Sequence, residues 1–273
     1  MISRIMFTVG LLICFVTAGV SQTNSNLASR EELNQGVVAF RAAHYEEAAE
    51  HFNNSLNLEP DFVIARLYLA TTYAQLFVPG VDTPENVVWA TKALGQYSEI
   101  LKGNPSDINS LKGLAYLQFQ LNNFSAAKES YKKSIALDPS DPELLYAAAV
   151  VNWSIANHEI IAEKAKLDAE LDYSLILSEG CSDLRAASLP GVDSGIAMLT
   201  KAISLRKDYD DAMAYMNLLY RLRAELECGN KKAFRADLQQ ANEWSDRASA
   251  ARKKKADAAS KDDQAQAPDK PRL

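Results

Sequence analysis

The stretch GLAYLQFQLNNFSAAKESYKKSIALDP, residues 113–139, decides the fold of this 273-residue chain. Its first half is an amphipathic segment that carries the small residue Ala115, and its second half is another amphipathic segment that closes on Pro139. Two further segments close in the same way, LNLEP at 56–60 and ILKGNP at 100–105. Because proline cannot continue a helix, each ending predicts the end of an amphipathic helix.

These helix endings recur at a fixed distance along the chain. Pro105 and Pro139 are 34 residues apart, and so are the small residues Gly36 and Ala70 further upstream. Pro60 and Pro105 are 45 residues apart, which places an 11-residue insertion inside the second repeat. An alanine stands 12 residues before each proline, and an aromatic residue stands eight before it: Ala48 and Phe52, Ala93 and Tyr97, Ala127 and Tyr131.

In this spacing and in these residue types the chain resembles the tetratricopeptide repeat (TPR) family, whose helix-turn-helix unit has 34 residues. The resemblance implies an all-α fold, a right-handed superhelical solenoid of antiparallel helix pairs, with small residues where helices approach closely. The repeats are expected near 29–62, 63–107, 108–141, 142–209 and 210–252, with a helical insertion in the fourth and a capping C-terminal helix in the last.

Composition agrees with packed helices. About 40 residues are alanine, whereas glycine (11) and proline (9) are sparse. An all-β sandwich or barrel would use more glycine and proline in its turns. The net charge of −6 gives the chain no overall attraction to nucleic acid or to anionic lipid.

The N-terminus has the pattern of an export signal. Arg4 is followed by an apolar stretch and then by the small residues Gly19 and Ser21, which predicts a signal peptide over 1–21 and a flexible linker over 22–28. An uncleaved membrane anchor is the alternative, although the apolar stretch is shorter than the roughly 20 residues of a spanning helix. We therefore expect an exported protein, periplasmic or secreted, without an integral membrane span in the mature chain.

Two insertions and a tail depart from the repeat pattern. In the first insertion, Thr83 and Pro84 predict the start of a helix, with threonine as its N-cap. The second insertion covers 155–191, and we expect a helical first half and a looped second half. It is either a binding element or a cover for the back of the repeats. The tail, 253–273, has almost no large apolar residue and is expected to be disordered.

The sequence offers no catalytic motif. It contains no P-loop, nucleophile elbow or HExxH, and its three histidines, His44, His51 and His158, have no second ligand at metal spacing. We therefore expect a protein that is not an enzyme and that has no cofactor and no metal.

What remains is the surface formed by the first helix of each repeat, which lines the concave groove in TPR arrays. Aromatic rings supply contact area, amides supply hydrogen bonds and arginines bind carboxylates, so this surface suits a protein or an extended peptide. The alternative is that several of the rings only fill the core between helices. The candidate groove residues are Phe40, Arg41, Thr71, Gln75, Tyr116, Phe119, Gln120, Tyr146, Trp153 and Arg221.

The number and the positions of the cysteines predict a disulfide between Cys181 and Cys228. Removal of the signal peptide removes Cys14 and leaves an even pair in an oxidising compartment. Cys181 precedes one helix of an antiparallel pair and Cys228 follows the other, so both are expected at the same end of the array. Two free thiols are the alternative.

Together these features predict an exported scaffold that binds a partner protein through its groove. The resemblance extends to exported bacterial TPR proteins that act as accessory factors in envelope, secretion or pilus assembly. The alternatives are a self-associating structural component of the envelope and a module that binds a cell-wall polymer. The partner, the process and the oligomeric state are not specified by the sequence.

Overall fold

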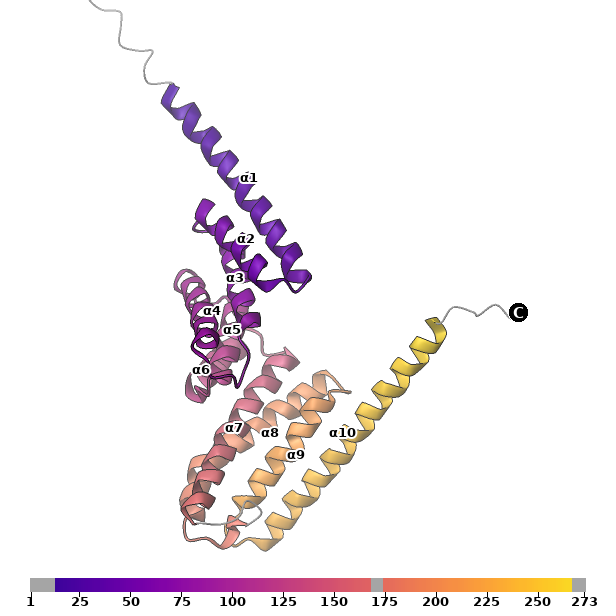
Figure 1. Ribbon diagram of the computed structural model, residues 1–273. Coiled ribbons are helices and arrows are strands. Elements are labelled where there is room, and N and C mark those ends of the chain that lie inside the picture. Colours follow the sequence, from indigo (N-terminus) through magenta and orange to yellow (C-terminus); the bar gives the residue numbers. More distant parts are fainter. Residues whose placement is uncertain (1–12, 168–173, 267–273) are drawn as a thin grey trace, which may run out of the picture. The chain divides into compact units, whose positions relative to one another are not determined.

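The computed structural model describes residues 13–167 and 174–266, and these residues form helices joined by short turns, with no β-strand among them (Figure 1). The chain divides into two compact units, an N-terminal unit of residues 1–122 and a C-terminal unit of residues 123–273. The fold is the expected all-α solenoid of antiparallel helix pairs.

From residue 13 onward the N-terminal unit contains five helices, and each packs against the next one along the chain. Its core consists of buried alanines together with larger residues such as Phe52, Leu69, Tyr73 and Tyr97. The helices are α1 (Ile13–Arg41), α2 (Tyr45–Leu58), α3 (Val63–Leu76), α4 (Pro84–Gly103) and α5 (Ile108–Gln120).

Aromatic rings on the second helices of the repeats pack directly against glycines on the first helices. A Cβ atom on Gly36 of α1 would stand 2.5 Å from Cε1 of Phe52 on α2, and a Cβ atom on Gly113 of α5 would overlap the ring of Tyr97 on α4. Phe52 also stacks on Tyr68 of α3, with ring centroids 5.3 Å apart. The aromatic position therefore fills the space within its own repeat and the space towards the next one.

The turns between helices follow local chemistry. Thr83 caps α4 as expected, since its side-chain oxygen accepts a hydrogen bond from the Asn86 N–H. The buried Asn86 side chain also bonds the backbone of Val78 and Val81, which fixes the first insertion. At the turn after α1, Ala43 has a φ of 60°, in the left-handed region that alanine seldom adopts.

The C-terminal unit has longer helices and one continuous core, which includes Leu145, Val192, Leu199, Met216 and Leu219. The strongest packing joins α7 to α8 and α9 to α10. Its elements are α6 (Phe124–Leu137), α7 (Pro142–Lys166), the short 3₁₀ helix η1 (Leu175–Leu177), α8 (Cys181–Leu205), α9 (Asp210–Glu225) and α10 (Lys231–Gln266).

The second insertion differs from the expectation of a loop over its second half. Helix α8 begins at Cys181, not near Val192, and passes through Pro190 without ending. Leu184, Ser188 and Val192 are all buried and follow a helical spacing that the core residues further along α8 continue. Packing against α7 therefore outweighs the cost of an internal proline. The insertion is an extension of one helix pair, and the described residues contain no further repeat between α7 and α8.

Both ends of the chain also contain more helix than expected. The segment 22–28, which we expected to be a linker, belongs to α1, because neither glycine nor proline interrupts the chain between Val20 and Gln35. Most of the segment that we expected to be a disordered tail belongs to α10, which is rich in alanine and lysine and continues to Gln266. Residues 1–12 of the predicted signal peptide lie outside the described residues.

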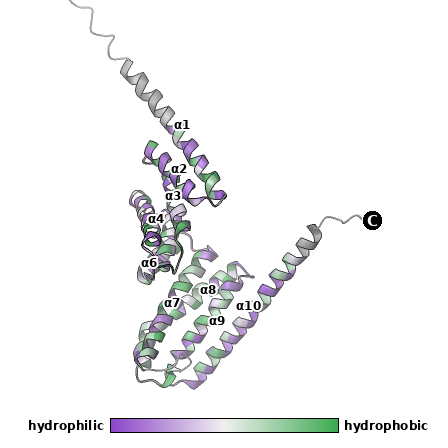
Figure 2. Cartoon of the chain, viewed as in Figure 1, coloured by the Kyte–Doolittle hydropathy of each residue, from purple (hydrophilic) through white to green (hydrophobic). Residues whose placement is uncertain are grey.

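Figure 2 shows hydrophilic colours along much of α10, whereas α7 and α8 carry more hydrophobic residues. Charged side chains fasten α10 to α9. The guanidinium of Arg223 makes a double contact with the buried carboxylate of Asp237, and Arg252 and Lys255 both bind Asp210. Among the described helices, none has a stretch long and apolar enough to cross a membrane.

We predict that Ala127→Leu destabilises the protein by about 1–3 kcal/mol, because Ala127 is fully buried on α6 and a larger side chain would overpack its site. Ala136→Leu, at an exposed position of the same helix, is the matched control and is expected to be neutral. Chemical denaturation measures both changes. A neutral Ala127→Leu would contradict the repeat register.

We predict that Ala43→Gly stabilises the protein by about 0.5–1 kcal/mol, because glycine adopts a positive φ without the steric cost that alanine has there. Ala197→Gly, at an exposed position in the middle of α8, is expected to destabilise by a similar amount. Urea unfolding of the two variants measures both changes. Opposite shifts of their unfolding midpoints would show that the gain at residue 43 comes from its positive φ and not from glycine in general. Loss of stability in Ala43→Gly would show that the turn is not strained.

Candidate functional site

The N-terminal unit places its candidate groove residues on α1, α3 and α5. Arg41 and Gln75 are exposed, and Tyr116 has 42% of its surface exposed. Phe119 and Gln120 are half-buried. The exposed members of this set, Arg41, Gln75 and Tyr116, are accessible to a partner.

Phe40 and Thr71 take part in packing. Phe40 is half-buried, and its ring makes edge contacts with Tyr45 and Tyr68 at centroid distances of 5.4 and 6.3 Å. The Thr71 hydroxyl donates to the Leu67 carbonyl oxygen at 2.9 Å and lies 3.3 Å from the Tyr97 hydroxyl. These two residues fit the alternative that some of the set fills the space between helices.

In the C-terminal unit, two predicted residues meet through a third that the sequence analysis did not name. The rings of Tyr146 and Trp153 on α7 both contact the ring of Tyr215 on α9 edge to face, at centroid distances of 5.5 and 5.6 Å. Tyr146 also packs against Tyr209, 5.2 Å away. All of these rings except Tyr209 are half-buried, so the cluster presents a partly exposed aromatic surface between α7 and α9.

Charged groups at the start of α7 anchor one end of this cluster. Glu143 accepts hydrogen bonds from Arg206, at 2.5 Å, and from the Tyr209 hydroxyl, at 2.6 Å. The Arg206 guanidinium also lies over the Tyr209 ring, 4.4 Å from its centroid. This arrangement holds Tyr209 in place against Tyr146.

The same environment shifts acid–base equilibria. Burial, with smaller contributions from Tyr215 and the carboxylates of Asp211 and Glu143, raises the pKa of Tyr146 to about 12. Burial opposes ionisation of Glu143, but the hydrogen bonds from Tyr209 and Arg206 together outweigh it and lower the pKa of this carboxyl. At neutral pH the cluster therefore consists of neutral tyrosines beside an ionised, paired glutamate.

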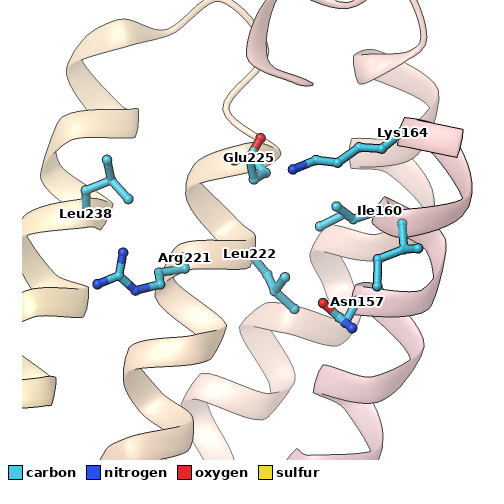
Figure 3. Close-up of a pocket in the computed structure, with 8 residues that line it drawn as sticks. Asn157, Ile160, Lys164, Arg221, Leu222, Glu225 and Leu238 are labelled. Carbon is cyan, nitrogen blue, oxygen red and sulfur yellow. The ribbon is translucent and has the colours of Figure 1, made fainter. Parts of the chain in front are cut away.

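Arg221 lies elsewhere, at a cavity of about 390 Å³ between α7, α9 and α10 (Figure 3). Its guanidinium donates to the side-chain oxygen of Asn217 at 2.8 Å and to that of Asn242 at 3.0 Å. The prediction that Arg221 belongs with the groove residues stays untested, and its surroundings differ from those of the aromatic cluster.

The Cys181 and Cys228 sulfurs are joined as a disulfide, with Cα atoms 5.6 Å apart. Further contacts surround the bond. Arg185 donates to the Leu226 carbonyl oxygen at 2.5 Å, and the Gly229 N–H donates to the Ile176 carbonyl oxygen at 2.6 Å. The start of α8, η1 and the turn between α9 and α10 are thus tied together.

Among the described residues, no group of three or more His, Cys, Asp or Glu side chains is placed to hold a metal ion. His51 pairs with Glu32, Nδ1 to Oε2, at 2.8 Å. His44 lies beside Glu47 at the surface.

Comparisons with known proteins agree with the TPR fold. The model of the tetratricopeptide repeat family matches residues 110–141. No curated protein matches the chain. Among solved structures, a crystal structure of MamA aligns with a TM-score of 0.55 and 16% identity over 81% of this chain and 96% of MamA.

Two further solved structures give the same result. A MamA RS-1 double mutant aligns with a TM-score of 0.57 and 12% identity, over 84% of this chain and 96% of its own. MamA from Desulfovibrio magneticus RS-1, residue 41 to the end, aligns with a TM-score of 0.52 and 12% identity, over 79% and 96%. At this identity the likeness concerns the fold.

The helix pairs, the glycine–aromatic contacts and these comparisons define an α-solenoid built from helix-turn-helix repeats. Residues 110–141 match a tetratricopeptide repeat, and the chain has the fold of a TPR solenoid.

We predict that Cys181 and Cys228 are oxidised in protein taken from an oxidising compartment, because the fold holds their Cα atoms 5.6 Å apart. Intact mass of non-reduced protein should show no uptake of an alkylating reagent at these two residues until a reductant is added. Their sequence separation of 47 residues implies that loss of the bond costs at most about 4 kcal/mol. Two alkylated cysteines before reduction would contradict the prediction.

Proposed function

We propose that this protein is an exported, non-catalytic scaffold that binds a protein or an extended peptide through the faces of its first helices. The observation that carries the proposal is that these helices leave aromatic and polar side chains partly or fully exposed, whereas the small residues beside them are buried. Tyrosine, tryptophan and arginine are the residues that contribute most to partner binding at protein interfaces.

Each unit offers a different surface for this role. On the N-terminal unit, Arg41, Gln75 and Tyr116 supply a charge, an amide and a ring. On the C-terminal unit, Tyr146, Trp153 and Tyr215 supply contact area that is already held in place by ring contacts and therefore loses little conformational entropy on binding.

Export is part of the proposal, and its support comes from the signal-like pattern of residues 1–21 and from the pairing of Cys181 with Cys228. An accessory role in envelope, secretion or pilus assembly is the process we propose for such a scaffold. It rests on the resemblance to exported bacterial TPR proteins alone.

Photo-crosslinking in living cells, followed by mass spectrometry, tests the proposal. A photoreactive residue at Tyr116, on the exposed side of α5, should capture one or a few proteins reproducibly. The same residue at Thr91, an exposed position on the second helix α4, is the matched control. Equal capture from both positions would contradict partner binding by the first helices. Capture of further copies of this chain would indicate self-association instead.

We predict that Arg41→Ala together with Tyr116→Ala reduces the amount of captured partner about tenfold, corresponding to about 1.4 kcal/mol. Both side chains are exposed, so helicity and the melting temperature should stay unchanged. Glu50→Ala with Thr91→Ala, on the exposed faces of α2 and α4, should leave capture unaffected. A drop in melting temperature for the first pair would show that these residues stabilise the fold.

A further inference from the structure

The cavity beside Arg221 exists because the helices of the C-terminal unit are longer than the repeat requires. Helix α7 has 25 residues, so its last turns continue past Trp153 and face the end of α9. Leu238 of α10 completes the lining (Figure 3). A volume of about 390 Å³ falls in the range of small-ligand pockets, roughly 300–1,000 Å³.

Aliphatic residues from all three helices line this cavity. Ile160 and Leu222 are buried, whereas Ile161 has 44% of its surface exposed at the rim. No aromatic residue lines the cavity among the described residues. The apolar part therefore suits a flexible or branched aliphatic group rather than a flat ring.

Three charged residues share the cavity. Lys164 has only 6% of its surface exposed, and in Figure 3 its amine and the Glu225 side chain point toward one another across the gap between α7 and α9. Two cationic residues and one carboxylate therefore give the lining a formal charge of +1.

Arg221 is held in position by neutral groups. Its Nε and one terminal nitrogen bind the side-chain oxygens of Asn217 and Asn242, and no carboxylate of the described residues lies within ion-pair distance of it. Its position is thus restrained while its charge is not neutralised. Arginine of this kind binds carboxylates through its remaining N–H groups.

Hydrogen bonds, ion pairs and the disulfide restrain the helices that form the walls of the cavity. Glu225 accepts a hydrogen bond from the Leu175 N–H at 2.8 Å, and Arg185 pairs with Glu227 at 3.3 Å, next to the Cys181–Cys228 bond. Arg223 and Asp237 fasten α10 on the other side. A cavity with restrained walls needs little ordering when a ligand enters.

We propose that this cavity binds an aliphatic carboxylate, with the carboxylate on Arg221 and the aliphatic group against Ile160, Ile161, Leu222 and Leu238. Two sources share this chemistry: a free medium-chain fatty acid, and the C-terminal residue of a peptide that ends in an aliphatic amino acid. The proposal does not depend on partner binding by α1 and α5, since none of its residues belongs to the N-terminal unit.

Calorimetry and NMR titration of the purified protein test the proposal with three probes: sodium octanoate, N-acetylleucine and the uncharged N-acetylleucinamide. At least one of the two carboxylates should bind with a dissociation constant of about 0.1–1 mM, as expected for so few atoms. The uncharged amide should bind at least tenfold more weakly than the carboxylate it matches. Octanoate binding points to a fatty acid, and binding of N-acetylleucine alone points to a peptide end.

Arg221→Gln should weaken binding of the carboxylate at least tenfold without lowering the melting temperature, because Arg221 is exposed. Arg235→Gln, an exposed position on α10 outside the cavity, is the matched control and should bind as the unchanged protein does. Ile161→Gln tests the aliphatic wall and should weaken octanoate binding several-fold. If neither carboxylate binds, if the amide binds as well as the acid, or if Arg221→Gln binds normally, the proposal is wrong.

Discussion

The close approach of a glycine on one helix to an aromatic ring on its neighbour is the contact on which the repeats depend. Gly36 has room for no side chain beyond hydrogen, because the Phe52 ring occupies the space where a Cβ atom would stand. The same relation joins Gly113 to Tyr97, and in the C-terminal unit a Cβ atom on Gly195 would stand 2.9 Å from Leu219. These short distances determine how the helices cross, and the crossing determines which helix faces stay exposed.

The sequence predicts this part of the fold because its residue pattern recurs. Small and aromatic residues return after 34 residues, or after 45 where the first insertion intervenes, so each repeat supports the interpretation of the others. The extension of α7 and α8 occurs once and has no such support. The sequence analysis predicts a loop for the second half of the insertion, although Leu184, Ser188 and Val192 follow the spacing of a buried helix face. The long α10 was missed for a different reason, since helical propensity rather than a buried face carries its C-terminal part.

The candidate site was less predictable than the fold. Register places Tyr146 and Trp153 on one face of α7, but their contact with Tyr215, 69 and 62 residues further along the chain, depends on how α7 and α9 pack. Glu143 and Arg206 illustrate the same limit, because each looks like an ordinary surface charge in the sequence and they meet only across the fold. Register places Arg221 among the groove residues, but it does not predict the hydrogen bond that its side chain donates to Asn242 on α10.

The extension changes what the C-terminal unit is able to do. A regular repeat ends its first helix after about 14 residues and leaves only a shallow face between neighbours. Here the extra turns of α7 and α8 create an end that would expose apolar residues such as Leu175 and Ile160 if nothing covered it. The turn between α9 and α10 covers that end, and Cys181, Arg185 and Glu225 fasten the cover through a covalent bond and hydrogen bonds. Because Glu225 takes part in these contacts and also lines the cavity between α7, α9 and α10, the contacts that stabilise the extension also restrain one wall of that cavity.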